Sequence, residues 1–146
     1  MNLPNKKILI SAVIVVLFTL VAFNFEKMTG SAVRTPKTTL FLSEDGENFI
    51  INPKGNDIVL SAGDNLYVKL KPARNSKRVF IYDPRYSSKA GTFETKCFER
   101  SGVKCISSLA VYKTPTDQWL NGVYTIKVAG VSGKAEFTLE NSNYQR

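Results

Sequence analysis

Histidine is absent from this chain of 146 residues. Its absence removes the commonest general base of enzymes and the usual nitrogen ligand of zinc. No Asn-x-Ser/Thr sequon occurs, so N-glycosylation is not expected. Helical periodicity is also lacking after residue 36, and no other set of residues has catalytic spacing. The sequence therefore predicts a protein that is not an enzyme, with no cofactor and no bound metal.

Two patterns that resemble chemical motifs have simpler structural interpretations. Ser101 and Lys104 fit a Ser-x-x-Lys pattern, but they lie in a short loop between two cysteines, where no helix can form. Glu44, Asp45 and Glu47 could offer oxygen ligands to calcium, which needs six to eight. Three carboxylates around one glycine turn are usually just solvated, so neither pattern predicts a site.

An apolar run follows directly after Lys6 and Lys7. With two interfacial residues included, the segment from Ile8 to Phe25 has 18 residues and no charge. As a helix it would be about 27 Å long, since each residue adds about 1.5 Å. That length just spans a hydrocarbon core of about 30 Å, so we expect this segment to contact membrane lipid. The two lysines would keep the N-terminus in the cytoplasm.

Two interpretations of the N-terminal segment remain open. Residues 1–27 can form an uncleaved signal-anchor helix, which makes the chain a single-pass protein of the cell membrane with its C-terminal domain outside. Alternatively they form a signal peptide that is cleaved near Ala32, after which the protein is secreted. Glu26 and Lys27 lie where a cleavage region should be uncharged, which favours the anchor. In both cases the remainder of the chain is expected outside the cytoplasm.

Positive charge dominates the chain, with 20 Lys and Arg against 12 Asp and Glu, a formal net charge of +8. Such a balance favours anionic partners, such as phospholipid headgroups or an acidic polymer of the cell envelope, or a protein partner. A solvated basic surface without a partner is the simpler interpretation. The charges are scattered and form no arginine-rich stripe, so no nucleic-acid partner is expected.

Cys97 and Cys105 are the only cysteines, and both lie in the part expected outside the cytoplasm. An even number there predicts one disulfide. Ser101 and Gly102 lie midway between them, which suits a hairpin joined by the disulfide beside its turn. Closing a loop of about nine residues contributes roughly 2.5 kcal/mol by the chain-entropy estimate. We expect a structural role for this disulfide.

Short β-rich runs separated by turn residues fill the rest of the chain. We expect a linker at residues 28–37, a β domain at 38–141 and a frayed tail at 142–146. Alternating apolar residues predict strands within the domain, and residues 92–98 and 105–112 are expected to form the disulfide-linked hairpin. The pattern predicts an all-β antiparallel sandwich of seven to eight strands.

The stretch Trp119-Leu120-Asn121-Gly122-Val123-Tyr124-Thr125-Ile126-Lys127-Val128, followed by a turn and Ala135-Glu136-Phe137-Thr138-Leu139, resembles a known pattern. It is similar to the closing hairpin of prokaryotic immunoglobulin-like surface domains, which read Trp, then Gly-x-Tyr-x-Val-x-Val, a turn, and Phe-x-Leu. The match implies an immunoglobulin-like sandwich and no particular ligand. A single-pass protein with one such domain also resembles archaeal surface proteins. Unlike antibody domains, this chain has cysteines too close together to join two sheets.

Aromatic and basic residues alternate in two segments that could form one binding surface. The candidate residues for binding a sugar or an anionic polymer are Tyr82, Arg85, Tyr86, Lys89, Tyr112 and Lys113. Strand positions explain two of the tyrosines without any ligand. Trp119 is expected to fill the base of the core.

These features predict a non-catalytic surface protein that acts in recognition, adhesion or envelope assembly. One alternative is a filament subunit, because archaeal pilins and archaellins resemble this layout of an apolar helix before a β-sandwich. Those families carry a basic-Gly processing site, whereas here Lys7 directly precedes Ile8. Another alternative is an accessory domain of a membrane complex.

Overall fold

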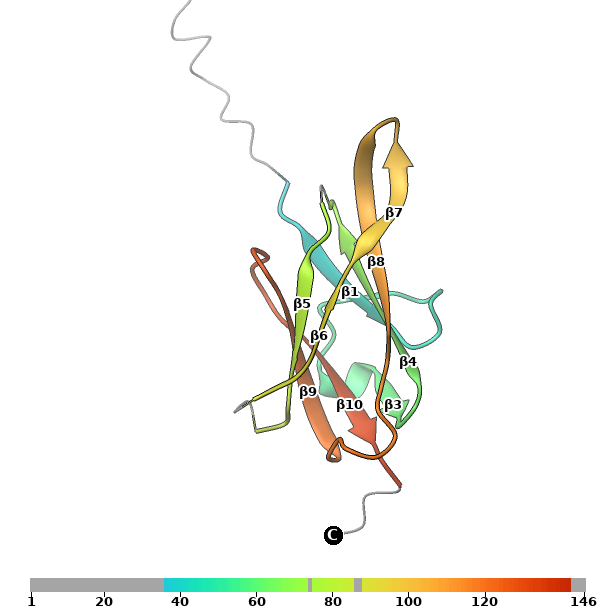
Figure 1. Ribbon diagram of the computed structural model, residues 1–146, viewed down its shortest axis with the longest axis vertical. Coiled ribbons are helices and arrows are strands. Elements are labelled where there is room, and N and C mark those ends of the chain that lie inside the picture. The colour runs from blue at the N-terminus through green and yellow to red at the C-terminus, as the bar shows by residue number, and fades with distance from the viewer. Residues whose placement is uncertain (1–35, 74, 86–87, 143–146) are drawn as a thin grey trace, which may run out of the picture. The chain divides into compact units, whose positions relative to one another are not determined.

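A computed structural model describes residues 36–73, 75–85 and 88–142. These residues contain ten strands and one short 3-10 helix (Figure 1). The elements are β1 (Thr39–Ser43), β2 (Ile50–Ile51), η1 (Gly55–Asp57), β3 (Val59–Ser61), β4 (Asn65–Lys71), β5 (Arg78–Tyr82), β6 (Lys89–Glu94), β7 (Lys96–Ser101), β8 (Lys104–Lys113), β9 (Gly122–Val128) and β10 (Ala135–Glu140). The expected all-β fold is confirmed.

The predicted membrane segment, Ile8 to Phe25, lies outside the described residues. Among the residues that the structure does describe, no helix is long and apolar enough to cross a membrane. Membrane insertion therefore stays a prediction from the sequence.

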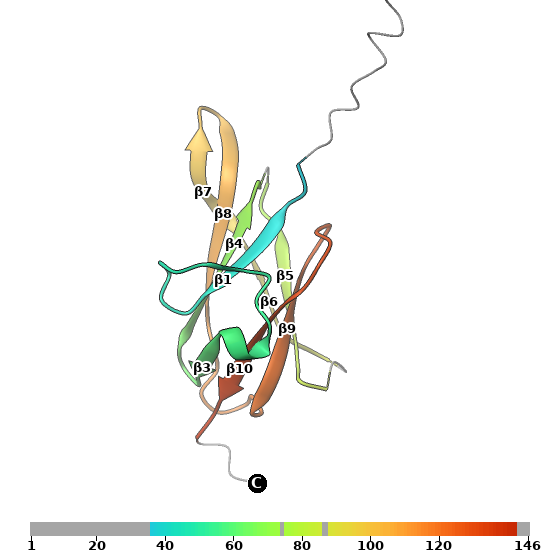
Figure 2. The ribbon, with the colours of Figure 1, turned by 180° about the vertical axis from the view of Figure 1, so that it is seen from behind.

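The strands form two sheets of five in a sandwich-like arrangement (Figures 1 and 2). The first sheet has the order β2-β1-β4-β8-β7, and all of its pairs are antiparallel. The second sheet has the order β3-β10-β9-β5-β6, in which only β3 runs parallel to its neighbour, β10. Short strands at two edges, β2 and β3, explain why the count exceeds the expected seven to eight.

The core lies between the sheets and follows the alternation of the strands. On β4, for example, Leu66, Val68 and Leu70 are fully buried, while the residues between them face outward. Burial of one such side chain contributes about 1.5–3 kcal/mol. The other strand residues of this core, contributed by β1, β3, β5, β9 and β10, are Leu40, Leu42, Leu60, Val79, Ile81, Tyr124, Ile126, Val128, Ala135, Phe137 and Leu139.

The single strand predicted at residues 92–98 is wrong, because the chain changes sheets there. β6 pairs with β5 in the second sheet, whereas β7 pairs with β8 in the first. Thr95, between them, is completely buried. Its backbone N–H donates to the Lys77 carbonyl at 3.0 Å, and its Oγ1 accepts from the Lys77 N–H at 3.0 Å. These bonds satisfy the backbone where the strand leaves one ladder for the other.

The hairpin of β7 and β8 confirms the predicted disulfide, since Cys97 and Cys105 are joined with a Cα–Cα distance of 5.8 Å. Ser101 pairs with Lys104, which leaves a two-residue turn. Gly102 has φ +59°, and Val103 is not among the described residues with positive φ. That combination is typical of a type II′ turn, whose first central position favours glycine.

Five aromatic rings stack in one continuous series inside the sandwich. Centroid distances between successive rings are 4.9, 5.8, 4.6 and 5.5 Å, and the planes are tilted by 14–23°. The rings, in order, belong to Phe93, Tyr112, Trp119, Tyr124 and Phe137. Trp119 is only 6% exposed, which confirms its predicted place in the core.

Tyr124 also closes the connection between β8 and β9. Its hydroxyl donates to the Leu120 carbonyl, four residues earlier, at 2.9 Å. Burial, together with the charge of Asp83, raises the pKa of Tyr124 to about 12. The neutral phenol is thus the form that the folded protein accommodates.

Replacing Tyr124 with Phe is expected to lower the free energy of unfolding by about 1 kcal/mol, because the partly buried Leu120 carbonyl loses its donor. Urea denaturation of the two proteins measures the difference. Tyr67→Phe, on the half-buried outer side of β4, serves as the matched control. Equal stability of wild type and Y124F would show that the hydrogen bond from Tyr124 to Leu120 does not stabilise the connection between β8 and β9.

Removing the disulfide with the double substitution Cys97→Ala and Cys105→Ala is expected to lower the free energy of unfolding by about 2.5 kcal/mol, since the unfolded chain gains freedom. Urea denaturation checks this value, and chemical reduction of the wild type should give a similar loss. An unchanged denaturation midpoint in both experiments would contradict it.

Candidate functional site

The acidic loop after β1 is held by hydrogen bonds to the carboxylate of Asp45. Asp45 accepts hydrogen bonds from the backbone N–H groups of Glu47 and Asn48, both at 2.8 Å. It also accepts from the Ser43 hydroxyl at 2.7 Å and from the Asn48 side-chain amide at 2.6 Å. The described residues contain no group of three or more His, Cys, Asp or Glu that could hold a metal ion.

These donors, the Asn48 backbone N–H first, hold the pKa of Asp45 well below its ordinary value of 3.8. A lowered pKa in the folded state means that the ionised carboxylate stabilises the fold above pH 3.8. This contribution is lost as the pH falls further, toward the folded-state pKa.

The destabilisation caused by Asp45→Ala should therefore be larger at pH 6 than at pH 2. Urea denaturation of both proteins at a series of pH values measures this difference. Asp117→Ala, in the exposed loop after β8, is the control. If Asp45→Ala costs the same stability at both pH values, the charge of Asp45 does not support the loop.

The structure divides the residues that were predicted to form one binding surface. Tyr82 and Lys89 are direct cross-strand partners in the second sheet. Tyr112 instead lies in the aromatic stack between the sheets, half-buried, and burial raises its pKa. Lys113 lies at the end of β8 in the first sheet, opposite Asn65. The two segments therefore do not form a single surface.

Arg85 has a different setting, and Tyr86 lies outside the described residues. Arg85 borders a hollow of about 420 Å³ between the loop after β5 and the loop after β8. The hollow reaches Trp119 and Tyr124 at its base, while Asp83 and Ser88 border it beside Arg85. The Ser88 hydroxyl donates to Asp83 at 3.0 Å, and this hydrogen bond joins the two residues at the rim of the hollow.

The outer side of β5, β6 and β9 carries what we call the basic-aromatic face, formed by Phe80, Tyr82, Lys89 and Lys127. Its residues occupy two neighbouring rows of the sheet. Phe80 lies opposite Lys127, and Tyr82 lies opposite Lys89. The two rings are half-buried and the two lysines are exposed. A basic and aromatic surface thus exists, but with two members that the sequence analysis did not select.

Each lysine of this face leans diagonally over the ring of the other row. Lys89 Nζ lies 4.6 Å from the centre of the Phe80 ring. Lys127 Nζ lies 6.0 Å from the centre of the Tyr82 ring. Cations at these distances are attracted by the ring faces, by about 0.5–1 kcal/mol at exposed sites. The ring contacts limit the positions of the two ammonium groups.

Simple alternation along β5 places the rings of this face. Val79 and Ile81 are completely buried, so Phe80 and Tyr82 must point to the outer side. The same alternation places Lys127 outside, between the buried Ile126 and Val128. Phe80 and Lys127, which the sequence analysis did not select, thus follow the period-2 pattern of their strands. Their place on one surface could be predicted only once β5 and β9 were known to be neighbours.

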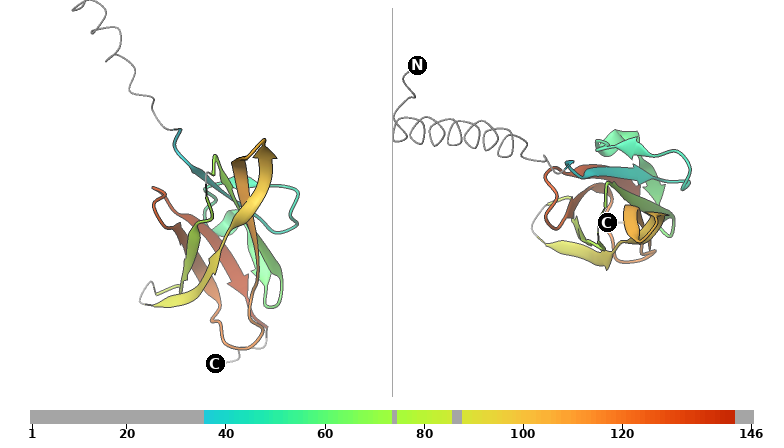
Figure 3. Two further views of the ribbon diagram at one scale, coloured as in Figure 1. Left: turned by 45° about the horizontal axis from the view of Figure 1, so that its top comes forward. Right: turned by 90° about the horizontal axis from the view of Figure 1, so that it is seen from above.

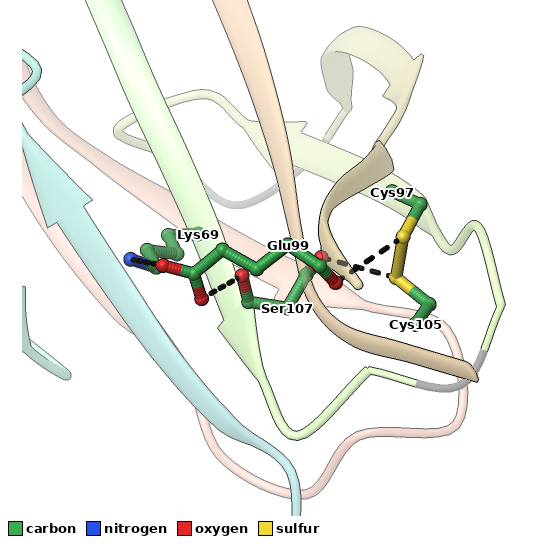
Figure 4. A network of polar contacts seen from close by, with 5 residues as sticks. All are labelled: Lys69, Cys97, Glu99, Cys105 and Ser107. Atoms are coloured by element: carbon green, nitrogen blue, oxygen red, sulfur yellow. Dashed lines mark hydrogen bonds and ion pairs between the residues drawn. A yellow bond between two sulfur atoms is a disulfide. The ribbon is translucent and has the colours of Figure 1, made fainter. Parts of the chain in front are cut away.

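A second polar cluster links β7 to β8 and to β4 within the first sheet (Figure 4). The Ser107 hydroxyl donates to Glu99 at 2.5 Å, and Lys69 Nζ lies 3.6 Å from the other oxygen of Glu99. The Ser107 hydrogen bond, with the charges of Lys69 and Lys71, lowers the pKa of Glu99. Lys69 Nζ also lies over the rings of Phe49 and Phe98, at 5.4 and 5.5 Å. The Glu99 carboxylate is therefore engaged in contacts within the fold.

No known protein-family model matches this chain, and no curated protein matches it significantly.

Proposed function

We propose that this chain is a non-catalytic surface protein, anchored by residues 8–25 or secreted, whose basic-aromatic face binds an anionic envelope polymer. The observation that carries the binding role is the diagonal placement of two lysine ammonium groups over two aromatic rings on one sheet face. The ammonium groups suit carboxylate, sulfate or phosphate groups, and the ring faces suit the apolar faces of sugars. The polymer class is thus an acidic polysaccharide.

We also infer that the sandwich is of the immunoglobulin-like type. Such sandwiches place their strands A, B, E and D in one sheet and C, F and G in the other. The order β1-β4-β8-β7 fits the first set, and β10-β9-β5 fits the second. The hydroxyl of Tyr124 bonds to the backbone just before β9, as in the tyrosine corner of these domains. The disulfide departs from the antibody pattern because it joins neighbouring strands of one sheet.

The disulfide supports the proposed location outside the cytoplasm. Disulfides persist in oxidising compartments and are rare in the cytosol. The uncharged run between Lys7 and Glu26 supplies a segment with the length needed for export or anchoring. Mass spectrometry of the native N-terminus distinguishes the two: an intact Met1 supports the anchor, and a start near Val33 supports secretion.

Reversing both charges of the basic-aromatic face, with Lys89→Glu and Lys127→Glu, is expected to weaken binding of dextran sulfate at least about tenfold. The reason is that a hydrogen bond to a charged group contributes about 1.5–3 kcal/mol. Calorimetry with dextran sulfate, neutral dextran and polyglutamate measures the affinity. If polyglutamate binds as tightly as dextran sulfate, sugar rings do not contribute to binding, and the assignment of a polysaccharide as the polymer is rejected.

Lys37→Glu with Lys113→Glu provides the matched control, since it makes the same change in net charge at exposed lysines outside this face. The control protein is expected to keep most of its affinity for dextran sulfate. Equal losses in the two variants would show that net charge alone drives binding, and the specific role of the face would be rejected.

A further inference from the structure

The tip of the β7–β8 hairpin is the most exposed apolar point among the described residues. The last pair between β8 and β4 is Ser108 with Leu70, so residues 100–105 extend past the end of β4 (Figure 1 and left view of Figure 3). Val103, at the turn, is 97% exposed. Phe98, on the same hairpin, is 59% exposed. Folding alone gives no reason for this composition.

The turn itself does not require valine at its second central position. A type II′ turn needs glycine at the first central position, which Gly102 supplies, and accepts polar residues at the second. The disulfide between Cys97 and Cys105 holds the arm beside the turn. The β-branched apolar side chain of Val103 is therefore exposed to solvent at the tip of a disulfide-linked hairpin.

Cations flank this apolar tip. Arg100 pairs with Cys105, and Lys104 pairs with Ser101, so both lie within one or two residues of the turn. Both are exposed, and among the described residues neither forms an ion pair. Glu99, the only carboxylate of the hairpin, is held by Ser107 and Lys69. An apolar tip with cations behind it matches the chemistry of an anionic lipid interface.

The hairpin tip lies at the end of the sandwich where Pro36 begins the described domain. The Thr38 hydroxyl donates to the Pro72 carbonyl at 2.9 Å, and the Ala73 N–H donates to the Ile106 carbonyl at 3.0 Å. These bonds place the start of β1, the end of β4 and the hairpin together, as Figures 1 and 2 both show. We call this end the Pro36 end.

At the opposite end, carboxylates are mixed with cations such as the exposed Lys113 at the end of β8. Asp64 lies in the turn between β3 and β4, Asp117 in the loop after β8, and Glu140 at the end of β10. Exposed cations at the Pro36 end include Lys37 and Lys71. An anionic surface therefore attracts the Pro36 end more strongly than the opposite end, which favours an orientation of the domain with the hairpin tip toward that surface.

The geometry points to the β7–β8 hairpin as a membrane-docking arm, in which Val103 enters the interface of an anionic bilayer and Arg100 and Lys104 contact lipid phosphates. This inference rests on the proposed anchoring of residues 8–25. The linker at residues 28–37 spans at most about 35 Å when extended. The tip projects about 17 Å beyond its last pair with β4, at about 3.3 Å per residue. The arm can thus reach the bilayer that holds the anchor.

The test uses the full chain, with Val103→Trp, reconstituted in vesicles whose lipids carry brominated acyl chains. Trp119 is buried, so the wild type supplies its background emission. The tryptophan of V103W is expected to be quenched in phosphatidylglycerol vesicles and much less in phosphatidylcholine. Val59→Trp is the matched control, because Val59 is 43% exposed on β3, away from the Pro36 end, and should not be quenched.

Adding Arg100→Gln and Lys104→Gln to V103W should lower the ratio of docked to undocked arms about fivefold for each cation, the effect of one charge near an anionic surface. Unquenched V103W in phosphatidylglycerol vesicles overturns the docking arm. Quenching that is equal for V59W and V103W also overturns it. If the tryptophan of V103W becomes shielded from solvent in the absence of lipid, and more so at higher protein concentration, the arm contacts a second copy of the chain. That result also overturns the membrane-docking arm.

Alkaline carbonate extraction of the same vesicles separates this inference from the anchor. A chain that resists extraction while V103W stays unquenched keeps the anchor and loses the docking arm. A chain that is extracted, although V103W was quenched beforehand, loses the anchor and keeps the arm as a lipid-binding element. Extraction without quenching rejects both.

Discussion

The stack of five aromatic rings between the sheets is the interaction on which the rest of this structure depends. Trp119 occupies its centre, between Tyr112 from the first sheet and Tyr124 from the second. Each aromatic pair contributes about 0.5–1.5 kcal/mol beyond the burial of its area. Because the stack contacts both sheets, it couples their positions more directly than aliphatic contacts of one strand with another.

Both proposed binding surfaces depend on this internal arrangement. Strands that bury Val79 and Ile81 must expose Phe80, and so the basic-aromatic face is the outer side of a strand fixed by the core. The hairpin arm is the continuation of β8, whose other end carries Tyr112 into the stack. A rigid core thus holds these surfaces in place, and pre-organised surfaces in general lose less entropy on binding.

Local patterns predicted those features that depend on neighbours in sequence. The cysteine spacing predicted the disulfide-linked hairpin, and alternation predicted most strands and the buried Trp119. The change of sheet at Thr95 was not predicted, because residues 92–98 alternate in the same way whether they belong to one sheet or two. Only the pairing of β6 with β5 and of β7 with β8 distinguishes the cases.

The predicted binding surface grouped residues that the fold separates, for a similar reason. Tyr82 and Lys89 do lie together, yet Tyr112 is part of the stack, because a tyrosine at a strand end suits either a wet or a buried setting. Phe80 and Lys127 join the surface across a strand pairing that links distant parts of the chain. Sequence spacing alone does not contain that pairing.

The coupling of the two sheets through Trp119 is tested most directly by native-state hydrogen exchange on Trp119→Ala. A loss of about 3–5 kcal/mol is expected for a large buried aromatic side chain. The exchange free energies should fall by the same amount in β8 of the first sheet and in β9 of the second. A loss confined to one of the two sheets would contradict the account.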